Sequence, residues 1–352
     1  MKILITGATG YIGNRLALEA AGKGWIVHAL VRDPFSKHIP SHKNIVLFKG
    51  DITDKASIEK AIAGCDKVIH SAAFTNEMDE NNPGFHDVNV EGTRNILEAA
   101  CMYNISRLVF TGSCSVFGPS GEQPISESDE KFIDPTTQYA FTKLKAEELV
   151  KEFCAKGLWS VIVSPSRIYG PGNLTSGNPI NKLILKVLKS RIALMPSDRK
   201  IKGNYVFIDD VVNGHFLALE KGQKGEKYII GGENISYKYF FNTLRMLSGK
   251  KIFIVPVAKW LLKSWSWFYN ALCYLAGTGT PISPKLIDRV WQNRALSCDK
   301  AVRQLGYRVT PFEEGMKKTI GHLKRSLSKE TAKSINQCTS SDLQLQHHLK
   351  QS

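Results

Sequence analysis

A glycine-rich turn at residues 6–13 constrains the fold of this chain more than any other feature. The apolar run Ile3-Leu4-Ile5 predicts a buried strand, and Thr6-Gly7-Ala8-Thr9-Gly10-Tyr11-Ile12-Gly13 follows it as a TGxxGxxG pattern. Between a strand and a helix, the first glycine permits a tight turn, the second lets the backbone approach a pyrophosphate, and the third allows close packing. The amino end of the helix supplies N–H donors to the phosphates. We therefore predict a dinucleotide site, with cofactor contacts from Gly7, Thr9, Gly10, Tyr11, Ile12 and Gly13.

Short aliphatic runs alternate with amphipathic segments through the first half of the chain. The predicted strands are Lys2–Thr6, Trp25–Val31, Ile45–Lys49, Lys67–His70, Arg107–Thr111 and Trp159–Ser164. The predicted helices are Tyr11–Lys23, Lys55–Ala63, Phe85–Tyr103 and Thr136–Lys156. This alternation indicates a parallel sheet covered by helices on both faces, which is a doubly wound α/β fold.

The length of 352 residues predicts one large domain or two fused domains. We expect a Rossmann domain over residues 1–170, its sheet completed by later segments near 203–231. Residues 171–325, with helices near Pro179–Lys189 and Asp210–Glu220, are expected to form a smaller mixed substrate or lid domain over the carboxyl ends of the strands. Residues 326–352 are rich in Ser, Thr, Lys and Gln, which predicts a disordered tail.

The chain is strongly basic, with 47 Lys and Arg against 32 Asp and Glu and a net charge of +15. Such an excess suggests an anionic partner, which is a nucleic acid, a phosphorylated small molecule or a membrane surface. The sequence has no helix-turn-helix, zinc pattern or aromatic RNA-binding motif, so we expect a small-molecule substrate and no nucleic acid. The seven cysteines are scattered without a CxxC pair, which indicates reduced cytosolic thiols, no disulfide framework and no metal site.

The residues after the second predicted strand bear on the choice of cofactor. NAD enzymes place an acid there for the ribose 2′-hydroxyl, whereas this chain has Arg32. A guanidinium suits a 2′-phosphate, and Lys37 adds a second charge, so we expect NADP(H) in preference to NAD(H). The alternative is that Arg32 points to solvent while Asp33 holds the ribose.

The ends of the third and fourth strands supply further predicted cofactor contacts. Asp51, followed by Ile52, is expected near the adenine amino group, although Asp51 could instead cap a helix. Thr53 or Asp54 suits that capping role better. Small residues after the fourth strand let the chain pass beneath the cofactor: Ser71, Ala72 and Ala73.

A phenol and an ammonium lie four residues apart in Tyr139-Ala140-Phe141-Thr142-Lys143, on one face of a predicted helix. A nearby cation stabilises a phenolate and lowers the pKa of a tyrosine, which suits it to acid/base work. Ser113, after the fifth strand, offers a hydroxyl at the same edge of the sheet.

Together these motifs resemble the extended short-chain dehydrogenase/reductase superfamily, also described as the NAD-dependent epimerase/dehydratase family. The resemblance covers about residues 1–325 and follows the family order. Beyond the residues already named, it is carried by three segments: Asn89-Val90-Glu91-Gly92-Thr93, Pro165-Ser166-Arg167-Ile168-Tyr169-Gly170-Pro171-Gly172 and Tyr205-Val206-Phe207-Ile208-Asp209-Asp210-Val211-Val212.

The resemblance implies a role for each catalytic residue. Tyr139 would be the acid/base, Lys143 would lower its pKa and hold the nicotinamide ribose, and Ser113 would hydrogen-bond the reacting oxygen. The backbone from Pro165 to Ile168 would line the nicotinamide. The cofactor would carry the hydride.

The same resemblance implies that Asn89 ties strand to helix. Dimers of the family usually pair through the two long helices, here Phe85–Tyr103 and Thr136–Lys156, so the resemblance allows a homodimer and leaves the oligomeric state open.

Three branches of the family can be compared with this chain. Sugar dehydratases place an Asp-Glu pair after the catalytic hydroxyl, whereas this chain has Cys114-Ser115, so we exclude dehydration. The segment around Arg32 resembles that of the dihydroflavonol-reductase-like and 3β-hydroxysteroid-dehydrogenase-like branch. This similarity favours an NADP-dependent ketone/alcohol oxidoreductase. The alternative is an NAD-dependent sugar-nucleotide epimerase, because the segment Gly231-Gly232-Glu233-Asn234 resembles a segment of bacterial proteins named sugar epimerases. A binding-only protein is disfavoured because Tyr139 and Lys143 are both present.

Two residues are candidates for substrate contact. Ser115 lies next to the catalytic segment. Arg167 would bind a substrate anion or pair with a carboxylate such as Asp209. Ser164 departs from the family pattern, because many sugar-nucleotide enzymes have Arg at this position.

Residues 257–272 predict an apolar helix with three tryptophans and a narrow polar stripe formed by Lys259, Lys263, Ser266 and Asn270. The favoured interpretation is a lid helix over the substrate site. The alternative is a peripheral membrane contact through residues 257–276, because Trp with Lys suits the membrane interface. Either interpretation suggests a fairly hydrophobic substrate, and we expect a cytoplasmic protein that in the second case associates with a membrane.

Overall fold

The computed structural model describes residues 1–76, 81–129, 131, 133–276 and 284–326. The predicted disordered tail at 326–352 therefore lies outside the described residues except for its first residue. In the part of the chain that is described, no helix combines the length and apolar content that a bilayer span needs.

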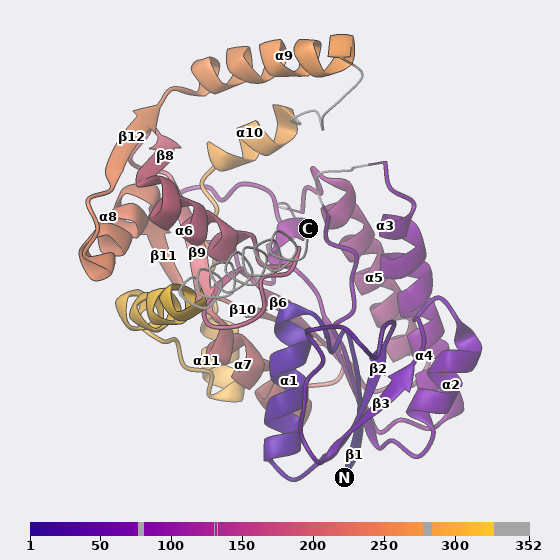
Figure 1. Ribbon diagram of the computed structural model, residues 1–352. Helices are drawn as coiled ribbons and strands as arrows, with labels where there is room; N and C mark the ends of the chain where they lie inside the picture. The colour runs from indigo at the N-terminus through magenta and orange to yellow at the C-terminus, as the bar shows by residue number, and fades with distance from the viewer. Residues whose placement is uncertain (77–80, 130, 132, 277–283, 327–352) are drawn as a thin grey trace, which may run out of the picture.

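A seven-stranded sheet forms the centre of the molecule in the order β10-β6-β5-β4-β1-β2-β3 (Figure 1). All of its neighbouring strands pair in parallel. Aliphatic side chains such as Ile3, Val109 and Val161 are fully buried, as a sheet covered on both faces requires. The strands are β1 (Lys2–Thr6), β2 (Ile26–Val31), β3 (Ile45–Lys49), β4 (Lys67–His70), β5 (Arg107–Thr111), β6 (Ser160–Pro165) and β10 (Lys227–Ile230).

Helices cover both faces of this sheet, which confirms the predicted doubly wound α/β class. One face is covered by α1 (Tyr11–Gly22), α7 (Ile208–Lys221) and α11 (Asp299–Leu305), which share a single apolar core with the sheet. The other face is covered by α2 (Lys55–Ile62), α4 (Gly92–Met102) and α5 (Gln138–Ala155). The two layers are visible on either side of the strands in Figure 1.

The predicted helix Phe85–Tyr103 is interrupted by a π-helical turn. It consists of α3 (Gly84–His86), the π turn Asp87–Glu91 and α4. The wide turn carries Asn89, whose side chain accepts a hydrogen bond from the Phe74 N–H (2.7 Å) and donates to the Phe74 carbonyl (3.1 Å) and the Thr142 hydroxyl (3.1 Å). Asn89 thus ties the segment after β4 to α5, as the sequence predicts.

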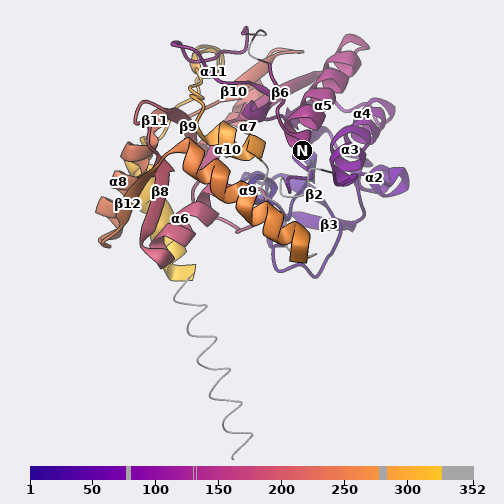
Figure 2. The ribbon, with the colours of Figure 1, turned by 90° about the horizontal axis from the view of Figure 1, so that it is seen from above.

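The C-terminal half forms two small sheets beside the main one. Strands β7 (Arg167–Tyr169), β9 (Lys202–Phe207) and β11 (Glu233–Ser236) form one, and β8 (Ile192–Pro196) pairs in parallel with β12 (Phe253–Val257). They are accompanied by α6 (Pro179–Ser190), α8 (Tyr237–Ser248), α9 (Lys259–Ala276), α10 (Pro284–Val290) and a helix over residues 312–326. Seen from above, α9 runs across the top of the molecule beside α10 (Figure 2).

One expectation about the sheet needs correction. Of the segments near 203–231, only β10 joins the seven-stranded sheet, whereas β9 pairs with β7 and β11. The reason is aromatic packing: Tyr205 and Phe207 of β9 lie in a separate core with Tyr169, Phe240 and Phe312. Burying these rings together outweighs adding another edge strand to the main sheet.

Candidate active site

The strand order reverses between β1 and β4, and the glycine turn lies at this position. In open α/β sheets, ligands bind outside the carboxyl ends of the strands at such a switch point. Gly7 has a φ of +73°, and a Cβ there would lie 2.7 Å from the Ala72 nitrogen. A Cβ on Gly13 would overlap the Gly7 carbonyl. Both positions therefore require glycine.

The amino end of α1 opens onto this crevice. The Gly10 N–H donates to the Gly7 carbonyl at 2.8 Å, which closes the turn. Gly10 is the N-cap and has no side chain to cap the first turn of the helix. The turn therefore combines a close backbone approach with the positive end of a helix dipole, an arrangement that fits the pyrophosphate of a dinucleotide.

Two predicted cofactor residues of this turn have buried side chains. Tyr11 is 3% exposed and its hydroxyl donates to the Gly170 carbonyl at 2.8 Å, while burial raises its pKa. Ile12 packs between two apolar cores. These two residues can contact a cofactor mainly through their backbone, and their side chains fix α1 against the C-terminal half.

The end of β4 is joined to the end of β1 by polar contacts. Ser71 donates to the Thr6 carbonyl (2.7 Å), and the Ala72 N–H donates to the Thr6 hydroxyl (3.2 Å). His70 bridges the hydroxyls of Thr6 (2.7 Å) and Thr93 (3.0 Å). Burial, aided by the Lys143 ammonium, lowers the pKa of His70 to about 3, so it is a neutral structural bridge near pH 7.

Ser71 and Ala72 therefore lie beside the glycine turn, and the contacts of Ser71, Ala72 and Ala73 with a cofactor stay predictions. Ala72 lies directly against Gly7, so a larger side chain at the turn would displace the floor of the crevice.

The residues that follow β2 lie at the same edge of the sheet. Arg32 and Lys37 are both exposed. The Asp33 carboxylate accepts a hydrogen bond from the Phe35 N–H at 2.9 Å, which engages it in the turn.

The residues after β3 have different surroundings, because some form a polar turn and Ile52 packs in the core. Asp51 accepts from the N–H (2.9 Å) and hydroxyl (3.0 Å) of Thr53, and Asp54 caps α2 through the Ala56 N–H. Asp51 is thus not the helix cap. The Ile52 side chain is 5% exposed and packs in the core, and its carbonyl accepts from Asn95 at 3.0 Å. The predicted contact of Ile52 with the cofactor would therefore involve little of its side chain.

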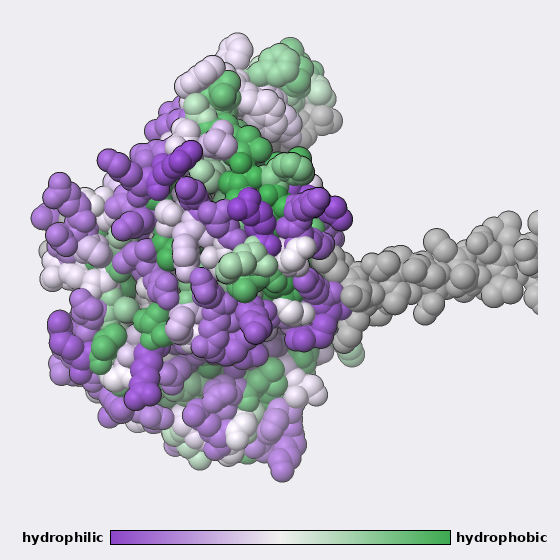
Figure 3. All heavy atoms as spheres, turned by 90° about the vertical axis from the view of Figure 1, so that its left-hand side faces the viewer, coloured by the Kyte–Doolittle hydropathy of each residue, from purple (hydrophilic) through white to green (hydrophobic). Residues whose placement is uncertain are grey.

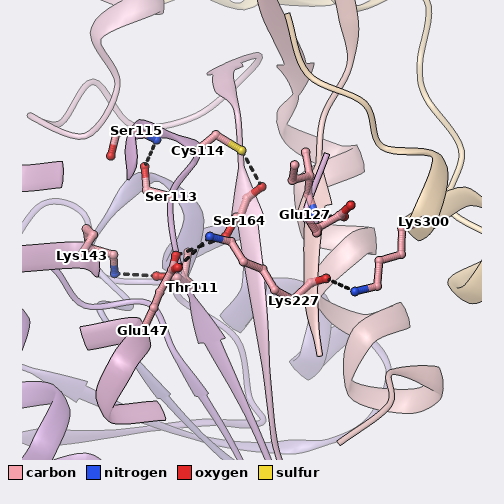
Figure 4. A network of polar contacts seen from close by, with 11 residues as sticks. Thr111, Ser113, Cys114, Ser115, Glu127, Lys143, Glu147, Ser164, Lys227 and Lys300 are labelled. Carbon is pink, nitrogen blue, oxygen red and sulfur yellow. Dashed lines mark hydrogen bonds and ion pairs between the residues drawn. The ribbon is translucent and has the colours of Figure 1, made fainter. Parts of the chain in front are cut away.

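Lys143 lies buried between α5 and the end of β5. Its Nζ donates to the Thr111 carbonyl at 2.6 Å and lies 4.1 Å from the centroid of the Phe110 ring, with the side chain 2% exposed (Figure 4). Burial lowers the pKa of Lys143 to about 7, and the nearby Glu147 carboxylate opposes this shift. An ammonium tuned in this way is a common feature of catalytic sites.

Tyr139 and Ser113 lie close to Lys143 along the chain or sheet. Tyr139 is half-buried, one helical turn before Lys143 on α5, whose N-cap Thr137 accepts from the Ala140 N–H. Ser113 follows β5, and its hydroxyl accepts from the Ser115 N–H at 3.1 Å at the start of a short 3₁₀ turn, Cys114–Val116. Two of the three predicted catalytic residues therefore belong to α5, and the third lies in the segment that follows β5.

An ion pair that the sequence does not reveal supports this region. Glu147 of α5 is 3% exposed and pairs with Lys227 of β10 at 2.7 Å (Figure 4). The Ser164 hydroxyl lies 3.4 Å from the same carboxylate, and a Cβ on Gly112 would lie 2.6 Å from it. Ser164, noted as a departure from the family pattern, is thus part of an internal network. No local motif predicts this pair, because α5 and β10 are far apart in sequence.

The segment after β6 carries the remaining predicted residues. Pro165 is buried and pairs with Ile230, and Ile168 is half-buried. Ser115 and Ser166 have buried hydroxyls for which the described structure offers no hydrogen-bond partner.

The alternative that Arg167 pairs with Asp209 is wrong. Asp209 pairs with Arg15 of α1, whereas Arg167 donates to the hydroxyls of Tyr205 (3.2 Å) and Tyr237 (3.1 Å). Asp209 begins α7, which packs against α1, so Arg15 is the nearer cation.

The parallel sheet, the glycine cradle at its switch point and the Tyr–Lys pair behind β5 define a dinucleotide-dependent enzyme of the Rossmann class. The model of the NAD dependent epimerase/dehydratase family matches residues 3–231. The chain belongs to this family and is an NAD(P)-dependent oxidoreductase of the extended short-chain dehydrogenase/reductase group.

Similar proteins include enzymes that act on different substrates. A 3-beta-hydroxysteroid dehydrogenase of Mycolicibacterium neoaurum is 28% identical over 87% of this chain and 86% of its own. A 4-hydroxy-2-methyl-3-oxo-4-farnesyl-3,4-dihydroquinoline-1-oxide ketoreductase of Stigmatella aurantiaca is 26% identical over 92% of each chain. Among solved structures, a UDP-glucose 4-epimerase of Thermotoga maritima shares the fold with a TM-score of 0.76, at 21% identity over 93% of this chain and 100% of its own.

Proposed function

We propose that this chain is an NADP(H)-dependent oxidoreductase that interconverts a ketone and a secondary alcohol, with Tyr139 as the acid/base. The observation that carries this proposal is the buried Lys143, whose ammonium is held by the Thr111 carbonyl one helical turn from Tyr139. The 3-beta-hydroxysteroid dehydrogenase and ketoreductase names of two relatives support a reaction of this class.

The residues present fit a nicotinamide dinucleotide. Gly7, Gly10 and Gly13 form a cradle that side chains would fill, and the first turn of α1 would hold the phosphates. When bound, the reduced cofactor supplies the hydride that the carbonyl carbon accepts.

The catalytic residues of the chain handle the proton and the oxygen. Tyr139 gives its phenolic proton to the carbonyl oxygen, while the Ser113 hydroxyl donates a hydrogen bond to the same oxygen. Lys143 stabilises the resulting phenolate, because it is an adjacent cation in a site largely shielded from water. In the direction of oxidation, Tyr139 takes the proton of the alcohol.

Replacing Tyr139 by Phe removes the proton donor and leaves the ring. We expect turnover to fall by at least about 10³-fold, because the general acid acts in the transition state. NADPH binding, measured by fluorescence titration, should change by less than about threefold. Retained turnover in Tyr139→Phe would show that another group is the acid.

The preference for NADP(H) is supported by the position of Arg32, which directly follows β2 and is exposed at the crevice edge. Asp33, the competing ribose ligand, is held by the Phe35 N–H. A guanidinium at this position can pair with a 2′-phosphate, and Lys37 adds to the local positive charge.

Arg32→Ala should therefore weaken NADPH binding by about 10- to 100-fold, as expected for the loss of a charge-assisted hydrogen bond, and leave NADH binding nearly unchanged. Fluorescence titration with both cofactors measures this, with exposed Arg199→Ala as the matched control. Equal affinities of the wild type for the two cofactors, or NAD that co-purifies tightly, would contradict the NADP reductase and support the NAD-dependent sugar-nucleotide epimerase.

We further propose that α9 contacts an anionic membrane surface. The polar stripe of α9 lies on the side of α10: Lys259 and Lys263, whose side chains are 44% exposed, each pair with Asp288 of α10 at 2.8 Å, and Ser266 is 2% exposed. The aromatic side chains lie outside. Trp260, Trp265 and Trp267 are 67%, 54% and 75% exposed. A helix of a globular protein in water packs its apolar face against the core, whereas the tryptophans of α9 lie open to solvent.

The neighbouring two-stranded sheet extends this apolar face. Its outward side chains are exposed and apolar on both strands, and Figure 3 shows hydrophobic residues gathered over this part of the surface. The outward side chains of the two strands are Ile192, Leu194, Phe253 and Val255. Exposed Arg191 and Lys251 lie just before the two strands, so cations flank the apolar face. Trp, Phe and flanking Lys or Arg fit the headgroup region of anionic lipids.

Co-sedimentation with phosphatidylglycerol vesicles tests this contact. The wild type should bind, 0.5 M salt should weaken binding through screening, and changing Trp260, Trp265 and Trp267 to Ser should reduce the bound fraction about tenfold or more. Met102→Ser with Phe141→Ser, which removes exposed apolar groups from α4 and α5, should bind like the wild type. Absence of lipid-bound wild type, or equal binding of the tryptophan variant, would contradict the proposal.

A further inference from the structure

Two arginines, Arg167 and Arg294, lie near each other and near the segments that follow β5 and β6, and neither forms an ion pair with a carboxylate in the described structure. Arg167 of β7 points at the hydroxyls of Tyr205 and Tyr237, and its guanidinium lies 5.5 and 5.7 Å from the centroids of their rings. Within the described ranges, no Asp or Glu lies at ion-pair distance from Arg167 or Arg294. Neutral phenols orient a guanidinium without cancelling its charge.

Arg294 forms the other half of this cluster. It is 8% exposed; one terminal nitrogen donates to the Phe117 carbonyl (2.7 Å) and the other to Gln292 (2.9 Å). Its buried Nε has no hydrogen-bond partner within the described structure. Burial and the nearby cations Arg289 and Arg167 lower the pKa of Arg294 to about 10, and the Asp134 carboxylate opposes this shift. Like charges are thus held close together inside the protein.

A glycine in β9 allows the guanidinium groups of the two arginines to lie close together. Gly203 of β9 forms a bridge with Arg294, and a Cβ on Gly203 would overlap the terminal nitrogen of Arg167. Any other residue at position 203 would push Arg167 away. The fold therefore makes room for the half-buried guanidinium of Arg167, which forms no ion pair with an Asp or Glu in the described structure.

Two hydroxyls that lack partners belong to the same edge of the sheet. Ser115 follows β5 and Ser166 follows β6, and these strands are parallel neighbours, so both segments emerge on the same side. Both hydroxyls are buried without a hydrogen-bond partner in the described structure. Ser115 lies two residues from Ser113, and Ser166 immediately precedes Arg167. Buried hydroxyls without partners and guanidinium groups without an ion pair are both groups that can bind an anion.

We propose that Arg167 and Arg294 form an anion-binding subsite that holds a carboxylate or phosphate group of the substrate. The inference rests on the proposed function, because it places the subsite beside the ketone-binding residues. It narrows the substrate to a ketone, or the corresponding alcohol, that carries a negative charge. Guanidinium groups bind both oxyanions through paired N–H···O hydrogen bonds.

Anion binding can be measured without turnover. Protein saturated with NADPH, so that the dinucleotide phosphate site is filled, is heated in chloride, acetate or inorganic phosphate at equal ionic strength. We expect acetate or phosphate at about ten times its Kd to raise the Tm by about 2–3 °C over chloride. Arg167→Gln should abolish this rise, whereas exposed Arg199→Gln should retain it. No rise in the wild type, or an equal rise in Arg167→Gln, would overturn the proposal.

Three ketones that share a 4-substituted acetophenone ring test the link to the substrate. They are 4-acetylbenzoate, its methyl ester and 4-acetylphenyl phosphate. Arg167→Gln should raise the KM of the preferred anion at least about tenfold and leave that of the ester unchanged, and Arg167→Lys should restore part of the difference. The two anions distinguish a carboxylate from a phosphate site. An equal loss for anion and ester would indicate a structural role for Arg167 and overturn the proposal.

The two proposals can fail separately. Tyr139→Phe should keep the anion-dependent rise in Tm, because the subsite does not include the phenol. An anion effect without any turnover of ketones would leave the subsite standing and count against the reductase. Turnover of the neutral ester without an anion effect would support the reductase and overturn the anion-binding subsite.

Discussion

The burial of one ammonium group is the constraint on which the rest of the site depends. Removing a charge from water is costly unless polar groups compensate, and Lys143 obtains that compensation from the Thr111 carbonyl and the face of Phe110. Both belong to β5, so Lys143 can be buried only where α5 packs against the end of that strand. The same packing brings Tyr139 and Ser113 to the same edge of the sheet.

The surrounding network keeps this ammonium available. The nearest buried carboxylate, Glu147, pairs with Lys227 at 2.7 Å and so its charge is shared with another cation. His70, beside the site, is neutral because of its lowered pKa and adds no charge of its own. Asn89 fixes α5 to the segment that leaves β4. The catalytic helix and the cofactor crevice at the switch point are therefore held as one unit.

Much of this arrangement could be predicted from local sequence. The glycines at 7, 10 and 13 and the alternation of strands and helices predict the Rossmann half, because both patterns depend on neighbouring residues. Contacts between distant segments could not be predicted. β9 leaves the main sheet to bury aromatic rings, and Arg294 reaches Arg167 only because residues 293–296 pair with segments more than ninety residues earlier. Periodicity locates the polar stripe on α9, but only the structure shows that its two lysines pair with Asp288 of α10.

The central claim is that the fold holds Lys143 with a pKa near 7, and pH-dependent stability tests it most directly. In the cofactor-free protein, the unfolded chain binds the Lys143 proton up to about pH 10.4, whereas the folded chain releases it near pH 7. Because the unfolded state binds more protons between these values, stability must rise with pH there. The unfolding free energy of the wild type minus that of Lys143→Met should be constant below pH 7. It should then rise by about 1.4 kcal/mol per pH unit toward pH 10. A difference that does not change between pH 7 and 10 would contradict the account.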